Sequence, residues 1–174
     1  GSTAADAGAA VAIAPTGDVV VAGTLGTATT LGSTQLAASS TNSFVARLTS
    51  DGKPKWAASF DSKTHNAPLD VAVGGDDRIY VGGWFEGTID TGLGLAKVVG
   101  DKDMFVAGFT SAGKPQLFAS YGASGQAEVR AIAIDGDSLV AGGQFNGQIK
   151  LGGTNDLMAA GGTDMFLFRI GLPN

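Results

Sequence analysis

Residues 71–85 read VAVGGDDRIYVGGWF, two short apolar runs separated by a tight polar turn. Valine, isoleucine and tyrosine favour strands, while the Gly-Gly-Asp-Asp group between the runs is typical of a turn. The segment therefore predicts two adjacent strands joined by a short turn. Related segments occur at residues 11–25 (VAIAPTGDVVVAGTL) and 132–145 (IAIDGDSLVAGGQF), so this pair of strands belongs to an internal repeat.

Several residue types recur with one period along the whole chain, and this period decides the fold. A glycine follows the second apolar run at intervals of 60 residues, and a phenylalanine recurs at intervals of 61. The turn Ser50-Asp-Gly-Lys-Pro54 returns as Ser111-Ala-Gly-Lys-Pro115. The sequence therefore predicts three repeats, at about residues 9–66, 67–126 and 127–174. The shared positions are Gly23, Gly83, Gly143, Phe44, Phe105 and Phe166.

Each repeat is expected to form four short strands. A longer connection rich in glycine and threonine, at about residues 23–42, joins the second strand of the first repeat to the third. Gly52 and Gly113 lie where the turn before the fourth strand needs a positive φ. The strands expected in the first repeat are Val11–Ala14, Val19–Ala22, Ser43–Leu48 and Lys55–Phe60.

Four antiparallel strands per repeat are typical of one blade of a β-propeller. The first strand of each repeat carries small apolar residues, as expected at a crowded centre, and the fourth carries bulky ones. The sequence therefore predicts an all-β fold, a propeller of three four-stranded blades forming one module over residues 1–174. The bulky residues are Trp56, Phe60, Phe118 and Tyr121.

The repeat resembles the SBBP-type β-propeller repeat of bacterial surface and secreted proteins. The resemblance rests on the first-strand phrases, Gly17-Asp-Val-Val-Val-Ala-Gly23, Phe44-Val-Ala-Arg-Leu48 and Asp51-Gly-Lys-Pro-Lys-Trp56, and it covers nearly the whole chain. The strand pattern is also similar to that of NHL-type propellers. The resemblance implies an extracellular, cell-surface or periplasmic bacterial protein. Because its motifs mark a fold and not a chemistry, it implies no catalytic residue.

The third repeat has no segment for its fourth strand, because its third strand, Phe166–Ile170, is followed by only four residues. A closed ring of single blades usually needs at least about four of them. Three arrangements therefore stay open: two copies closing a six-bladed ring as a homodimer, a piece of a longer propeller, or a stable three-bladed arc.

The composition excludes several classes of protein. Hydrophobic residues make up 44% of the chain, too many for a disordered protein, and 28 of 174 residues are glycine, which favours short strands and turns. The net charge is −5 and lysines do not cluster, which argues against a nucleic-acid groove. The absence of cysteine excludes disulfides and thiolate metal sites.

The chain shows no sign of membrane insertion. No apolar run approaches the roughly 18 residues that span a bilayer, and no signal peptide is visible. Gly1-Ser2 reads as the remnant of a cleaved tag, which leaves open whether an export signal was removed.

Catalytic and metal-binding candidates are few. The only histidine, His65, lies in a polar loop and is interpreted as solvent-exposed, which makes a Ser–His–Asp triad improbable. The pairs Asp76/Asp77, Asp101/Asp103 and Asp135/Asp137 could offer oxygens to calcium, but most are ordinary turn residues. No cofactor or metal site is predicted. Asp103 and Asp164, at the position of Asn42, are expected to tie the preceding loop backbone through a side-chain acceptor.

Aromatic side chains are the remaining binding candidates. Trp84 and Tyr80 could stack on a sugar or a peptide, and Trp84 stands where the other repeats have Thr24 and Gln144. Packing between repeats is the competing interpretation. We therefore expect a non-enzymatic binding, adhesion or scaffolding module that contacts a protein or a glycan through its loops. The alternatives are a purely structural segment of a larger propeller and a fragment of a propeller-type lyase or hydrolase.

Overall fold

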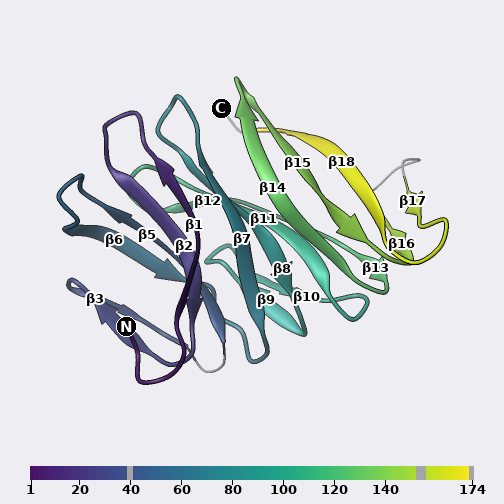
Figure 1. Ribbon diagram of the computed structural model, residues 1–174, viewed down its shortest axis with the longest axis horizontal. Coiled ribbons are helices and arrows are strands. Elements are labelled where there is room, and N and C mark those ends of the chain that lie inside the picture. Colours follow the sequence, from purple (N-terminus) through teal and green to yellow (C-terminus); the bar gives the residue numbers. More distant parts are fainter. Residues whose placement is uncertain (39–40, 152–155, 173–174) are drawn as a thin grey trace.

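The computed structural model describes residues 1–38, 41–151 and 156–172, and these residues form strands, turns and loops without any helix. The all-β prediction with antiparallel sheets is therefore confirmed. In the same residues no helix is long and apolar enough to cross a membrane. Three main sheets stand side by side in chain order (Figure 1).

Sheets 1 and 2 each contain four antiparallel strands in the same order along the chain. In sheet 1 the strands are β1 (Ala7–Ile13), β2 (Val19–Leu25), β5 (Asn42–Leu48) and β6 (Pro54–Ser59). In sheet 2 they are β7 (Asn66–Val73), β8 (Ile79–Phe85), β11 (Asp103–Phe109) and β12 (Pro115–Tyr121).

Sheet 3 has three strands among the described residues: β14 (Ala127–Asp135), β15 (Ser138–Phe145) and β18 (Asp164–Gly171). The first strands β1, β7 and β14 start earlier than the apolar pattern indicates. They also carry polar residues such as Asp70, Glu128 and Arg130, so the expectation of purely small apolar first strands is too simple.

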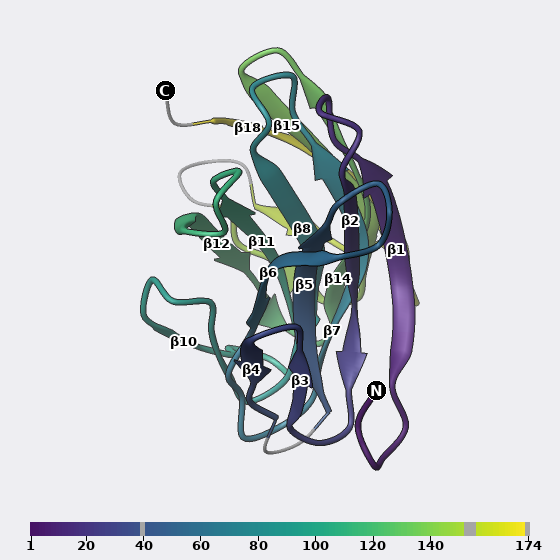
Figure 2. The ribbon, with the colours of Figure 1, turned by 90° about the vertical axis from the view of Figure 1, so that its left-hand side faces the viewer.

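The connections between second and third strands contain additional short strands that the sequence reading did not predict. They form the hairpins β3 (Thr29–Leu31) with β4 (Thr34–Leu36) and β9 (Thr88–Asp90) with β10 (Leu95–Lys97), and the small sheet of β13 (Ala123–Ser124), β16 (Gln148–Ile149) and β17 (Leu157–Met158). Figure 2 shows β3, β4 and β10 at one end of the molecule, opposite the tight turns. This end is called the loop end below.

The recurring glycine is explained by a bulge in each first strand. The register of β1 on β2 shifts between Gly8 and Ala10, and equivalent shifts occur in the other two sheets. The bulge brings a carbonyl of the first strand against the second, so that a Cβ on Gly23 would lie 2.1 Å from the oxygen of Ala7. Only glycine fits there. The corresponding distances for Gly83 and Gly143 are 2.2 and 2.0 Å.

The sheets pack face to face through two apolar clusters. We call the side of a sheet that looks toward the next sheet in the chain its forward face, and the opposite side its rear face. The first cluster joins the forward face of sheet 1 to the rear face of sheet 2 through residues such as Val45 and Phe105. The second joins sheets 2 and 3 through residues such as Val106 and Phe166. Strand β7 lies against both β1 and β14, so the first strands of the three sheets run close together.

Candidate functional site

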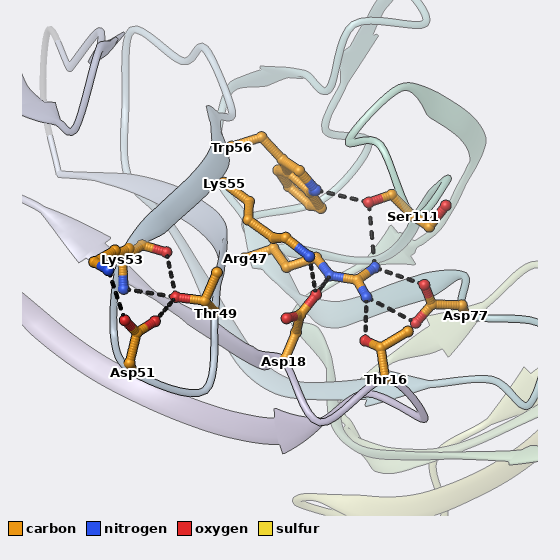
Figure 3. Close-up of polar contacts among 10 residues, drawn as sticks. All are labelled: Thr16, Asp18, Arg47, Thr49, Asp51, Lys53, Lys55, Trp56, Asp77 and Ser111. Carbon is orange, nitrogen blue, oxygen red and sulfur yellow. Dashed lines mark hydrogen bonds and ion pairs between the residues drawn. The ribbon is translucent and has the colours of Figure 1, made fainter.

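The most extensive polar cluster joins the turns of sheets 1 and 2, and Arg47 is its centre (Figure 3). Arg47 lies on β5, where the alternation of the strand turns its side chain toward sheet 2. Only 3% of that side chain is exposed. Burial of a guanidinium is costly unless its donors are matched, so its partners decide what this cluster does.

All the donors of Arg47 have acceptors. Its Nε donates to Asp18 Oδ2 at 2.7 Å, and its Nη2 donates to Thr16 Oγ1 at 2.8 Å. Toward sheet 2, the two Nη atoms lie 2.9 and 3.0 Å from the carboxylate oxygens of Asp77, and Nη1 donates to the carbonyl of Ser111 at 3.2 Å. The arginine therefore ties the β1–β2 turn to two turns of the neighbouring sheet.

Asp18 is held between two cations. Lys55 Nζ lies 2.7 Å from the same Oδ2 atom that Arg47 contacts. The hydrogen bond from Lys55, and after it that from Arg47, lowers the pKa of Asp18 below its usual value even though burial acts to raise it. Burial acts to lower the pKa of Arg47, but the hydrogen bonds that Arg47 donates to Asp77 and Asp18 outweigh it and raise that pKa. Both groups are thus ionised at neutral pH.

Trp56 completes the cluster on its apolar side. Its indole Nε1 donates to the Ser111 carbonyl at 2.8 Å, and its ring lies 6.3 Å from that of Phe109. One carbonyl of sheet 2 therefore accepts from two side chains of sheet 1. The arrangement is an inter-sheet clamp whose charges are matched internally, and it leaves no nucleophile or base free for chemistry.

The two aromatic candidates of β8 have different surroundings, because Tyr80 lies beside the tight turn and Trp84 lies near the loop end. Tyr80 is 2% exposed within the second apolar cluster, so it has no ring face available to a ligand. Trp84 is half-buried, and Lys102 Nζ lies 4.1 Å from the centre of its ring, a cation–π contact. Of the two, Trp84 is the residue that a ligand could still reach.

An exposed apolar group lies at the same end of sheet 2. Along β10 and the residue pair after it, Ala96 and Val98 pack on the first cluster, whereas Leu95 and Val99 point outward with 70% and 71% of their surfaces exposed. Leu93 is also exposed. We call Leu93, Leu95 and Val99 the loop-end patch. The sequence reading did not identify it, because the alternation that reveals it lies in a connection where no strand was expected.

The recurring acidic position ties loops to strands. Asp103 is buried at the start of β11 and accepts hydrogen bonds from the amides of Val99 at 3.0 Å and Gly100 at 3.5 Å. Asp164 accepts from the amide of Ala160 at the start of β18. Each of these carboxylates therefore holds the backbone of the loop that precedes its own strand.

The remaining candidates do not converge. The side chain of His65 is 59% exposed, and its Nδ1 lies 3.6 Å from Glu86 Oε2. Asp76 pairs with Arg78, and Asp135 pairs with Arg169. Within the described part of the chain, no group of three or more potential ligands is placed to hold a metal ion.

No model of a known protein family matches the chain, and no curated protein matches it.

Proposed function

We propose that the chain is a β-propeller segment of the SBBP type that serves as a non-enzymatic binding or scaffolding module of a bacterial secreted or surface protein. Three successive antiparallel sheets with the same strand order support the architecture. Their face-to-face packing and the close approach of β1, β7 and β14 also support it.

The loop-end patch carries the binding part of the proposal. Exposed large apolar side chains that gather on one part of a surface often mark a protein contact, and Leu93, Leu95 and Val99 lie within one short segment. Leu95 and Val99 are held in this position because the other side of their segment is anchored on the core through Ala96 and Val98. Trp84 adds an aromatic ring at the same end of sheet 2, of the kind that dominates binding energy in many interfaces.

The saturation of the clamp favours binding over catalysis. Its arginine, aspartates and lysine contact one another and the Ser111 carbonyl, so these groups serve to hold two sheets together. The lyase or hydrolase alternative would need a different set of convergent groups.

The test uses an oligosaccharide array and a displayed random-peptide library as probes. We expect a bound glycan or peptide whose affinity falls about tenfold or more in a Leu95→Glu/Val99→Glu variant or in Trp84→Ala. Leu167→Glu, an equally exposed apolar position on another surface, is the matched control and should bind normally. Circular dichroism would verify that every variant is folded. Absence of any ligand, or ligands that ignore the loop-end substitutions, would contradict the proposal.

A purely structural role is the second candidate, and one observation favours it. The rear face of sheet 1 and the forward face of sheet 3 both expose large apolar side chains, including Val11 and Leu167. A segment within a longer array of sheets would bury both faces. A chain that binds no probe and gains stability when further repeats are fused to it would fit this role.

A further inference from the structure

The forward faces of the three sheets use equivalent positions. In each sheet the third strand pairs with the second in the same register, so that Val45, Val106 and Leu167 occupy one position. Val45 and Val106 are fully buried against the following sheet, whereas Leu167 is 70% exposed. Met165 is exposed in the same way, although its counterpart Met104 is buried. The forward face of sheet 3 is thus a packing surface that no other sheet covers among the described residues.

The rear face of sheet 1 is the matching surface, because it has the positions that the other two sheets bury against a preceding sheet. Val11, Val71 and Ile132 occupy one position in the first strands. Val71 and Ile132 are buried against the preceding sheet, at 5% and 9% exposure, whereas Val11 is 65% exposed. Ile13, two residues further along the same side of β1, is equally exposed. The rear faces of sheets 2 and 3 are thus buried in the internal interfaces, whereas the equivalent face of sheet 1 is exposed.

We infer that the forward face of sheet 3 packs head to tail against the rear face of sheet 1 in a second copy of this chain. Each open face has its matching surface elsewhere on the same molecule, so a second copy supplies what both faces lack. Exposed positions of sheet 3 lie on both of its outer strands, at Ala133 on β14 and Leu167 on β18. A surface of that width fits a sheet better than a single extended peptide.

The polar residues on the forward face of sheet 3 also agree with this pairing. Val20 lies beside Arg47 on the forward face of sheet 1, and the same combination returns on sheet 3 as Val140 beside Arg169. Arg47 is covered by the next sheet, whereas 56% of the Arg169 side chain is exposed, where it pairs with Asp135. The face of sheet 3 therefore repeats a surface that this chain already uses to bind a following sheet.

The geometry of the internal clamp identifies the contacts that Arg169 would make. Arg47 reaches the carbonyl of Ser111, which lies in the turn between the third and fourth strands of sheet 2. The corresponding turn of sheet 1 has the same backbone hydrogen bond and carries Ser50 at that position, followed by Asp51. In the head-to-tail contact, Arg169 would meet the carbonyl of Ser50 and the carboxylate of Asp51 of the second copy, which are complementary to its charge.

The first experiment measures the molar mass of the whole chain by light scattering over a range of concentrations. We expect a concentration-dependent dimer. Leu167→Glu and Val11→Glu each place a charge in one of the two faces, and each should weaken association by about tenfold or more. Val99→Glu introduces the same charge at an exposed residue outside both faces and should leave the mass unchanged. A chain that stays monomeric at every concentration overturns the inference.

Mixing the two variants tests the polarity of the contact. In a head-to-tail contact, Val11→Glu keeps an intact sheet 3 and Leu167→Glu keeps an intact sheet 1, so the mixture should recover association that neither variant shows alone. A Val11→Glu variant that still dimerises by itself would show that like faces pair. Failure of the mixture to associate would show that the two faces do not meet, and either result overturns the inference. The result is independent of ligand binding at the loop end, so either proposal can fail without the other.

Discussion

The interface between sheets 1 and 2 and the interface between sheets 2 and 3 use the same register but different chemistry. On the forward face of sheet 1, Val20 pairs with Arg47. On the forward face of sheet 2, Tyr80 pairs with Gly108 at the same two positions. A Cβ on Gly108 would approach the Tyr80 ring to 3.0 Å, so the tyrosine occupies the space that the arginine takes in the first interface. The first interface thus places a small valine beside a long charged arginine, whereas the second places a large tyrosine ring beside a glycine, which has no side chain.

This difference separates the features that all three repeats share from those that vary between the two interfaces. The backbone register and the bulge glycines are common to all three sheets, because the close approach of strands requires them. The side chains that fill each interface differ: the Arg47 clamp bridges the first, whereas Tyr80 and Gly108 stand at the equivalent positions of the second. Buried ion pairs often contribute more to the choice of partner than to stability, so the clamp would specify which sheets meet.

The largest expected effect comes from the aromatic centre of the first interface. Phe60 is fully buried and lies between Phe105 and Phe109, with ring centroids 5.7 and 5.8 Å away. Its truncation in Phe60→Ala should cost about 3–5 kcal/mol in the free energy of unfolding, measured by chemical denaturation. Tyr121 holds the same position in sheet 2, is only partly buried and touches Phe168. Tyr121→Ala should therefore cost clearly less, and an equal or larger loss would refute the comparison.

The clamp predicts an intermediate effect. Arg47→Met keeps an apolar stem but removes the donor to Asp77 and leaves the Ser111 carbonyl with Trp56 alone, which should cost about 1–3 kcal/mol. Arg169→Met removes the equivalent but exposed residue and should change stability by less than about 0.5 kcal/mol. Both are to be measured by denaturation in a Leu167→Glu background, where self-association is suppressed. Similar losses for the two arginines would mean that the clamp contributes no more than a surface ion pair.

Much of the fold could be predicted from the sequence, because period and turn chemistry are local signals. The positions of Gly23, Gly83 and Gly143 gave the repeat, and Gly52 and Gly113 have the positive φ expected for their turns, 82° and 81°. The small hairpins were missed. Strands such as β3 and β9 contain three residues each, too few to show an alternation, and their pairing depends on packing against the main sheets.

The candidate sites were harder to predict, because they depend on contacts between repeats. Arg47 was visible as a charged residue within the apolar phrase Phe44-Val-Ala-Arg-Leu48, and that was its only signal. Its partners come from turns 30 and 64 residues further along the chain, at Asp77 and Ser111, which no local pattern connects. Tyr80 was a candidate for stacking on a ligand, with packing between repeats as the alternative, and the alternation of β8 turns it toward sheet 3 and buries it.

The smallest expected effect is a pH dependence confined to the first interface. Lys55 and Arg47 lower the pKa of Asp18 in the folded chain below its ordinary value of 3.8. The stabilisation by the ionised carboxylate is therefore complete above that value and is lost as the pH falls through the lower, folded pKa. Asp18→Asn should be destabilising at pH 6, and its penalty relative to the native chain should shrink as the pH drops below about 3.8.

Thermal unfolding of both proteins across this range measures the difference. Asp156→Asn, which replaces an exposed carboxylate in the connection before β17, controls for the general loss of charge. Because the second interface has no counterpart of Arg47, acid should loosen sheet 1 from sheet 2 before it affects the contact of sheets 2 and 3. Hydrogen exchange at low pH would reveal this order as earlier loss of protection in β5 than in β15. Equal loss in the two strands would show that the clamp does not distinguish the interfaces.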